Sequence, residues 1–133
     1  MSNTYESRQI GVSISTSAAL AYAFLAEPLN FPQWASGLGA LHEAGGQWIA
    51  ATPDGPMRVR FAEKNTFGVL DHWVSPQSGA EIYIPLRVIA NGAGCELVFT
   101  LFRQPGMSQE KFEADAAWVE RDLLAAKKLL EAH

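Results

Sequence analysis

One adjacent pair of ionisable residues, Asp71 and His72, lies in a mostly apolar segment and is the most suggestive of catalytic chemistry. An imidazole titrates near neutral pH, so His72 could act as a general acid or base, or as a hydrogen-bond partner for a ligand. Adjacent strand residues point to opposite faces, so the two side chains cannot form one dyad. The competing interpretation is a histidine that a backbone carbonyl or a buried water satisfies, without a chemical role.

Tyr83 and Arg87 form a second candidate pair. They are four residues apart in a segment that is typical of a strand, which places them on one side of it. Together they could bind a carboxylate or a phenol; the alternative is that they are polar residues of an exposed sheet face. We expect Asp71 to form a solvated ion pair with Arg60 on the outer, convex face of the sheet.

Other polar residues give weaker signals. Asp115 and Asp122 border the apolar stripe of the last helix, where either could face a cavity mouth or form the wet edge of that helix. Three scattered histidines and one cysteine, Cys95, lack the spacing of a metal site, so we expect no metal. Because a phosphate-binding glycine loop, a G-x-S-x-G elbow and an H-E-x-x-H motif are missing, we expect no cofactor either.

The elements that must position these residues begin with a strand over residues 8–15, in which apolar and small side chains alternate. A short helix over 18–25 follows, capped by Thr16 or Ser17, and Pro32 can open one further helical turn through Trp34. Six more strands are predicted, with short turns that make neighbouring strands antiparallel: 41–44, 47–52, 57–62, 69–75, 81–90 and 96–103.

One long helix is predicted over residues 109–132, with Ser108 as its N-cap. Its apolar stripe has helical spacing and consists of Phe112, Ala116, Val119, Leu123, Ala126 and Leu130. Acidic residues crowd its first half and two lysines stand near its end, as the helix dipole favours.

The turns also predict which strand residues face one another. The pairs expected on the concave, apolar face are Phe61 with His72, Val59 with Val74, Val88 with Leu97, Leu86 with Phe99, and Ile84 with Leu101. Tyr83 and Arg87 then lie on the convex face, although a register slip of one residue would turn both inward.

Composition bounds the class of protein. The chain has 133 residues, of which 48% are hydrophobic and 18% charged, and its net charge is −4. These values exclude a disordered chain and fit one domain over residues 1–133. The negative charge disfavours nucleic acid and anionic membranes as partners. Without a visible signal peptide or membrane-spanning run, and with one cysteine, we expect a cytoplasmic protein.

The order of elements is similar to the helix-grip fold of the START/Bet v 1-like (SRPBCC) superfamily, including its polyketide cyclase/dehydrase-like branch. The resemblance runs from Gln9 to Leu130 and is carried by the stretch STSAALAYAFLAEPLNFPQWA and the long closing helix. It implies an α+β fold in which a curved antiparallel sheet of six to seven strands wraps around the C-terminal helix, with two short helices after the first strand. It also implies an apolar cavity between sheet and helix, with Trp34 at its entrance. Met107, in the segment before the last helix, could flank the same end of that cavity or the opposite one.

The first hypothesis is therefore a cofactor-free protein that binds a small hydrophobic or aromatic molecule, such as a lipid, quinone or polyketide-like compound, in that cavity. The residues expected to bind the ligand are Trp34, Phe61, His72, Leu86, Phe99, Phe112, Asp115 and Val119. A second hypothesis is a cyclase or dehydratase in which His72 is the catalytic acid/base and Tyr83, Arg87 or Asp115 orients the substrate. A third is a protein-interaction module like the Hsp90 activators of the superfamily. The sequence does not indicate an oligomer.

Overall fold

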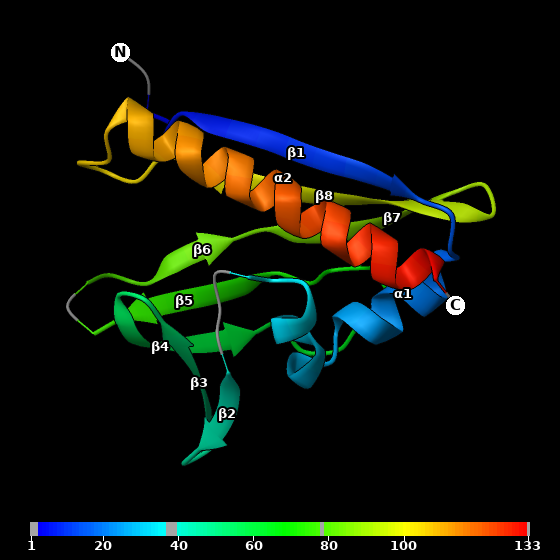
Figure 1. The fold of residues 1–133 in the computed structure, drawn as a ribbon, viewed down its shortest axis with the longest axis horizontal. Helices are drawn as coiled ribbons and strands as arrows, with labels where there is room; N and C mark the ends of the chain where they lie inside the picture. The colour runs from blue at the N-terminus through cyan, green and yellow to red at the C-terminus, as the bar shows by residue number, and fades with distance from the viewer. Residues whose placement is uncertain (1–2, 37–39, 78, 133) are drawn as a thin grey trace.

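A computed structural model of the chain describes residues 3–36, 40–77 and 79–132. It has the predicted α+β order of elements (Figure 1): β1 (Ser7–Ile14), α1 (Ala18–Leu25), η1 (Pro28–Gln33), β2 (Leu41–Ala44), β3 (Gln47–Thr52), β4 (Gly55–Phe61), β5 (His72–Pro76), β6 (Ile82–Ile84), β7 (Leu86–Asn91), β8 (Gly94–Phe102) and α2 (Gln109–Glu131). There are eight strands in these ranges, where the sequence predicted six to seven, because Pro85 divides the predicted strand 81–90 into β6 and β7.

The strand pairs in the described ranges are all antiparallel, and the strands form two sheets with the orders β1-β8-β7 and β2-β3-β4-β5-β6. The two sheets meet where β6 continues into β7 across Pro85. A bridge between Val69 and Arg87 has the same register as the β5–β6 ladder, and the Thr100 N–H donates to the Pro85 carbonyl. The result is one strongly curved surface, and Figure 1 shows α2 lying along its β1–β8 side.

The predicted face assignments are largely confirmed. The observed pairs include Phe61 with His72, Val59 with Val74, Val88 with Leu97, and Leu86 with Phe99. The ladder between β7 and β8 begins at Leu86, so the predicted pairing of Ile84 with Leu101 is not formed, and Ile84 lies opposite His72 instead. Tyr83 and Arg87 are on the convex face, as the favoured register predicted.

Just before β5, side chains replace one backbone hydrogen bond between Leu70 and Leu86. The Leu70 N–H donates to the Leu86 carbonyl, but the Leu86 N–H donates to the Asp71 carboxylate. The Leu70 carbonyl, in turn, is 3.1 Å from Nδ1 of His72. Proline cannot donate a backbone hydrogen bond, and Asp71 lies opposite Pro85 in this register. The Leu86 N–H and the Leu70 carbonyl therefore do not bond to each other. The Asp71 side chain satisfies the first and the His72 side chain satisfies the second.

The helices begin where the sequence predicted. The hydroxyl of Ser17 accepts from the Leu20 N–H at the start of α1, and that of Ser108 accepts from the Lys111 N–H at the start of α2. A 3₁₀ helix of six residues, η1, contains both Pro28 and Pro32. Because a 3₁₀ helix has three residues per turn, Phe31 and Trp34 project from the same side of this segment.

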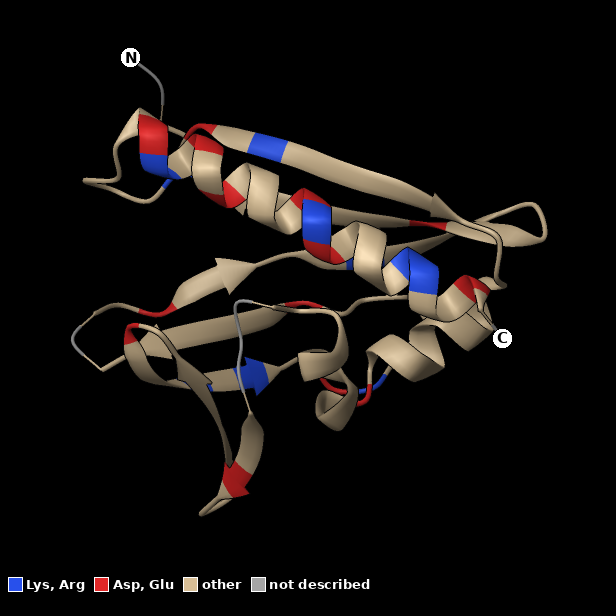
Figure 2. Cartoon of the chain, in the orientation of Figure 1, with Lys and Arg blue, Asp and Glu red and all other residues tan. Residues whose placement is uncertain are grey.

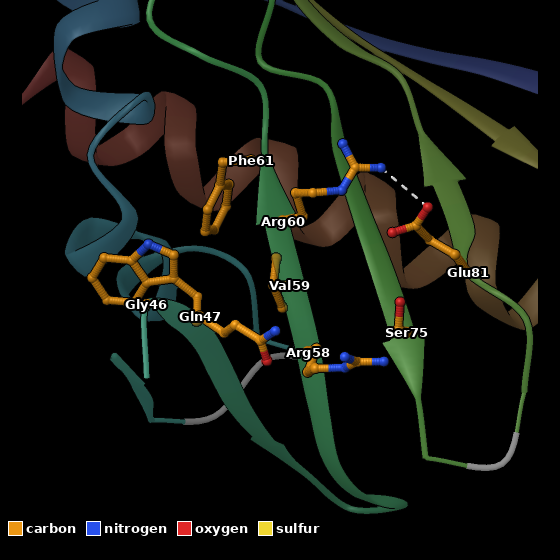
Figure 3. Close-up of a pocket in the computed structure, with 9 residues that line it drawn as sticks. Gly46, Gln47, Arg58, Val59, Arg60, Phe61, Ser75 and Glu81 are labelled. Carbon is orange, nitrogen blue, oxygen red and sulfur yellow. Dashed lines mark hydrogen bonds and ion pairs between the residues drawn. The ribbon is translucent and has the colours of Figure 1, made fainter. Parts of the chain in front are cut away.

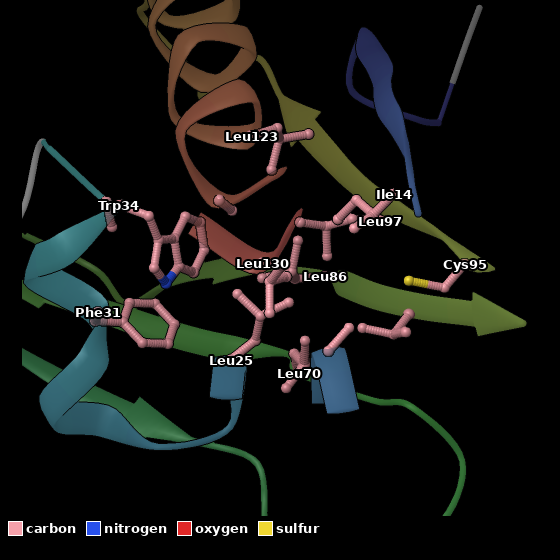
Figure 4. Packing of buried hydrophobic residues seen from close by; sticks show 14 of the residues in the cluster. Ile14, Leu25, Phe31, Trp34, Leu70, Leu86, Cys95, Leu97, Leu123 and Leu130 are labelled. Atoms are coloured by element: carbon pink, nitrogen blue, oxygen red, sulfur yellow. The ribbon is translucent and has the colours of Figure 1, made fainter. Parts of the chain in front are cut away.

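The core lies between the sheet, α1, η1 and α2. Its most completely buried large side chains are Phe112, Leu25, Leu86, Leu97 and Leu123. Figure 4 shows part of this core, with Phe31 and Trp34 at one end of the view and Ile14, Leu97 and Cys95 at the other. Charged residues of both signs are scattered over the outside, with several on α2 (Figure 2). Within the described ranges, neither helix has the length and apolar character to cross a membrane.

Candidate functional site

Two adjoining cavities lie between the sheet and α2. The larger has a volume of about 270 Å³ and opens partly to solvent; its lining is Val74, Ile82, Tyr83, Ile84, Phe99, Thr100, Leu101, Phe102, Gln104, Met107, Asp115, Trp118 and Val119. The smaller has a volume of about 130 Å³ and is lined by Phe31, Trp34, Ala35, His72, Val74, Ile84, Phe99, Val119, Asp122 and Leu123. They share Val74, Ile84, Phe99 and Val119, so the two cavities lie side by side with a common wall. Together they reach the lower end of the roughly 300–1,000 Å³ typical of small-molecule sites.

Aromatic rings build one wall of the smaller cavity. The ring of Phe31 is 4.9 Å from that of Trp34, 4.9 Å from that of Phe61 and 5.3 Å from that of His72, measured between centroids. These rings come from η1, β4 and β5, so the cluster forms only when the short helices close over the sheet. Tilted and edge-on pairs at this spacing are favourable ring geometries.

His72 is 4% exposed and faces this cavity. Its Nδ1 lies against the Leu70 carbonyl, which requires that this nitrogen carry the proton of the neutral ring. Burial lowers the pKa of His72 from 6.5 to about 4, against the opposing effects of Leu70 and of Asp71. The ring is therefore neutral at pH 7, and its Nε2 lone pair is a hydrogen-bond acceptor that no described residue occupies.

Trp34 supplies the complementary donor. The side chain is 4% exposed, and its Nε1–H has no hydrogen-bond partner among the described residues. Figure 4 shows the indole nitrogen on the side of the ring that faces Phe31. Leaving a buried donor unpaired costs about 1–3 kcal/mol, and a contact of an N–H with an aromatic face is a second-order interaction that offsets only part of it.

A chain of hydrogen bonds joins Asp122, which lines the smaller cavity, to Ser36 and Trp118. The Ser36 hydroxyl donates to Oδ1 of Asp122 at 2.5 Å and accepts from Nε1 of Trp118 at 2.6 Å, while the Ser36 N–H donates to Oδ2 of Asp122. Burial raises the pKa of Asp122, and the hydrogen bonds from Ser36 oppose that rise. These contacts hold the segment after η1 against α2.

Asp71 faces away from the cavity and is 5% exposed. Its carboxylate accepts from the Tyr83 hydroxyl at 2.6 Å, from Nε and a terminal nitrogen of Arg87 at 2.8 Å each, and from the Leu86 N–H at 3.0 Å. Burial alone would raise the pKa of Asp71, but the hydrogen bonds from Arg87 and Tyr83 outweigh it and hold the pKa below its usual range. Tyr83 and Arg87 therefore bind a carboxylate together, as expected, but that carboxylate is the side chain of Asp71.

The predicted pairing of Asp71 with Arg60 is therefore wrong. Arg60 pairs with Glu81 at 3.1 Å and its guanidinium lies over the Trp73 ring at 4.1 Å. Arg60 lies opposite Trp73 in the β4–β5 ladder. The Asp71 carbonyl accepts from the Ala62 N–H, and the Asp71 carboxylate accepts from the Leu86 N–H. The approach of β7 to Asp71 in the folded chain, rather than the pairing of the strands on either side of the 62–71 segment, decides the partner of Asp71.

A separate hollow of about 310 Å³ lies along β4 and involves β3 and β5 (Figure 3); its lining is Gly46, Gln47, Trp48, Arg58, Val59, Arg60, Phe61, Ser75 and Glu81. Figure 3 shows the Arg60 side chain directed toward Glu81, to which it is bonded. This hollow is more polar than the space under α2, and the aromatic cluster does not open into it except through Phe61.

The structure brings together most of the residues predicted to bind a ligand, but not all. Trp34, His72, Phe99 and Val119 line the smaller cavity, and Phe99, Asp115 and Val119 line the larger. Phe61 stands behind this wall, in contact with the rings of Phe31 and His72. Leu86 and Phe112 are fully buried in the core and line neither cavity.

Two further expectations concern the ends of the cavity. Trp34 was expected at an entrance, but it is buried, because η1 turns it inward beside Phe31. Met107 lines the larger cavity, at the opposite end from Trp34. Asp115 lines the same end, where it is also bonded to Lys111.

Sequence reasoning missed several lining residues, above all Phe31, Val74, Ile84, Trp118 and Leu123. Phe31 carried a usable signal, because its spacing of three from Trp34 around Pro32 fits one face of a 3₁₀ turn. Val74 and Ile84 lie two and twelve residues from His72 and were already on the predicted concave face.

Solved structures with a similar fold include an uncharacterised protein from Bacillus thuringiensis (TM-score 0.76, 12% identity, 94% of this chain and 98% of that chain covered). A START superfamily protein from Mycobacterium smegmatis has a TM-score of 0.70 and 10% identity, and the match covers 95% of this chain and 97% of that chain. The di-domain aromatase/cyclase BexL from the BE-7585A biosynthetic pathway has a TM-score of 0.73 and 14% identity, and the match covers 92% of this chain and 45% of that chain. Neither family models nor curated proteins match the sequence.

These likenesses, together with one to Ara h 8.0201, show that the chain has the helix-grip fold of the START/Bet v 1-like (SRPBCC) superfamily. The likeness extends to aromatase/cyclase domains, as the sequence predicted. At identities of 9–14% they define the architecture, and the chemistry has to be argued from the site itself.

Proposed function

We propose that the protein binds a small hydrophobic or aromatic molecule, of the lipid, quinone or polyketide type, between the sheet and α2. The observation that carries this proposal is the pair of adjoining cavities under α2, whose linings are mostly apolar and aromatic side chains with few polar groups. Sites of this composition bind through apolar contact, while a few polar groups fix orientation. The helix-grip fold supports the proposal, since its members typically enclose such a cavity.

We propose binding rather than catalysis. The enzymatic hypothesis needs His72 to act with Tyr83, Arg87 or Asp115 in one pocket. Tyr83 and Asp115 line the larger cavity and His72 the smaller, while the Tyr83 hydroxyl and Arg87 are engaged by Asp71. A neutral imidazole with a pKa near 4 is a weak general base at pH 7.

The interaction-module hypothesis stays a prediction. The large hydrophobic side chains exposed in the described ranges come from α1, η1, loops, β6, β7 and α2: Tyr5, Leu20, Leu29, Phe67, Tyr83, Ile89, Trp118 and Leu124. This spread does not identify one docking face.

We also propose a cytoplasmic location, which suits the single, buried thiol of Cys95.

Binding is tested with three probes of different shape: a long-chain fatty acid, menadione as a quinone, and 2-naphthol. Thermal shift and titration calorimetry of the full chain should show saturable binding of at least one probe. Val119 lines both cavities, so the larger side chain of Val119→Phe should reduce the room in each and weaken that binding at least tenfold. Leu124→Phe, on the exposed side of the same helix, is the matched control and should bind normally. Failure of all three probes, or equal binding by Val119→Phe, would falsify the proposal.

A further inference from the structure

The smaller cavity contains two polar groups that the fold leaves unused and that have complementary hydrogen-bonding character. Nε1–H of Trp34 is a buried donor without a partner among the described residues. Nε2 of His72 is an acceptor, because the Leu70 carbonyl fixes the proton on Nδ1 and burial keeps the ring neutral. Both side chains line the same cavity of about 130 Å³.

The remaining walls supply no other partner for these groups. They are formed by Phe31, Ala35, Val74, Ile84, Phe99, Val119 and Leu123, all apolar, and by Asp122. Asp122 is already engaged by the hydroxyl and the N–H of Ser36. Buried polar groups in folded proteins are nearly always paired, and an unpaired one requires an explanation such as a ligand. A bound molecule with a group that both accepts and donates one hydrogen bond would satisfy Trp34 and His72 at once.

We propose that the cavity selects an aromatic ligand that carries a hydroxyl group, a phenol or naphthol, with the oxygen accepting from Trp34 Nε1 and the O–H donating to His72 Nε2. A hydroxyl has both capacities on one atom, whereas a quinone or ketone oxygen can only accept and an ammonium can only donate. The adjacent rings of Phe31 and Phe99 provide the apolar contact that an aromatic ligand needs. This inference rests on the proposed function and specifies its ligand class.

The test compares 2-naphthol with naphthalene, which has the same ring system without the hydroxyl. Dissociation constants of both are measured at pH 7 by calorimetry for the full chain. Two new hydrogen bonds predict that 2-naphthol binds about tenfold more tightly than naphthalene. In Trp34→Phe and His72→Phe this preference should fall several-fold, mainly through weaker 2-naphthol binding. Trp48→Phe, a tryptophan outside the cavity, is the matched control and should keep the preference.

A measurement on the unmodified protein keeps the inference testable if a variant does not fold. In ¹H–¹⁵N spectra the indole N–H signal of Trp34 should move downfield with 2-naphthol and stay nearly in place with naphthalene. Equal affinity of the two probes, or an unmoved Trp34 signal at saturation with 2-naphthol, overturns the hydroxyl-binding role and leaves the apolar cavity as a binding site. Binding of neither probe overturns this inference, and it overturns the proposed function as well if menadione and the fatty acid also fail.

Discussion

At the scale of single residues, Asp71 and His72 show how two adjacent ionisable side chains acquire opposite environments. His72 faces an apolar cavity and is kept neutral by burial, whereas Asp71 faces the convex side and is kept charged by Arg87 and Tyr83. Both also bond to backbone groups of the interrupted ladder at Leu70 and Leu86. Alternation along an extended chain is what separates the two.

The environment of His72 makes the stability of the protein depend on pH. The folded pKa, about 4, is below the ordinary value of 6.5, so the unfolded chain binds the proton more readily. The resulting stability is fully present above pH 6.5 and is lost as the pH falls toward 4. Between pH 7.5 and 5, the free energy of unfolding should fall by about 2 kcal/mol more in the wild-type chain than in His72→Phe.

Urea denaturation at the two pH values measures this difference. His42→Gln removes an exposed histidine and serves as the control, which should follow the wild-type chain. Asp122 lines the same cavity and titrates in all three proteins, so its contribution cancels in the comparison. Parallel curves for wild type and His72→Phe would show that His72 is not held neutral by burial.

At the scale of elements, the Asp71 carboxylate joins the two halves of the sheet. It precedes β5 and binds Tyr83 of β6 and both the backbone of Leu86 and the side chain of Arg87 in β7. These contacts span the point where Pro85 interrupts the strand. A charged group that accepts several hydrogen bonds at such a site is costly to replace, because its donors lose their partner too.

Substitution at this junction should therefore destabilise the fold. Asp71→Asn keeps the shape but loses the charge and the bidentate bond to Arg87, and we expect it to lower the free energy of unfolding by about 2–3 kcal/mol. Tyr83→Phe removes one hydrogen bond and should cost about 1 kcal/mol. Glu81→Gln, which breaks the exposed pair with Arg60, is the control and should cost less than about 1 kcal/mol. An equal effect of Asp71→Asn and Glu81→Gln in urea denaturation would contradict the assigned role.

At the scale of the whole molecule, the hydrophobic residues form both a packed core and the lining of the two cavities. Leu123 is 1% exposed and lies at the boundary, since it belongs to the core cluster and also lines the smaller cavity. Leu97 and Leu25 lie deeper in the core, away from both cavities. Stability and ligand binding should therefore be coupled through residues of the boundary.

Leu123→Ala tests that coupling. Removal of a buried leucine side chain should lower the free energy of unfolding by about 2–5 kcal/mol, while Leu124→Ala, on the exposed side of α2, should change it by less than about 0.5 kcal/mol. A probe that binds the folded state at a hundred times its Kd should restore about 2.7 kcal/mol. Thermal and urea unfolding with and without 2-naphthol measure both effects. If the probe does not stabilise any of the three proteins, ligand space and core are not linked in this way.

The sequence by itself determined the elements and most of their faces. Alternation in the strands, caps at Ser17 and Ser108, and the short turns at 65–68 and 91–94 are local features, and local features fix helix starts, strand register and side-chain direction. That is why the α+β helix-grip fold, the inward position of His72 and the outward position of Tyr83 could be predicted.

Only the tertiary structure decided which residues meet across elements. The burial of Trp34, the partners of Asp71 and the aromatic cluster around Phe31 depend on how η1 and β7 approach the rest of the sheet. Those approaches are set by long-range packing, in which a shift of a few ångströms changes partners without changing any local pattern. For the same reason the sequence named an apolar face but could not divide it into core and cavity: Leu86 and Phe112 pack, whereas Val119 and Phe99 line open space.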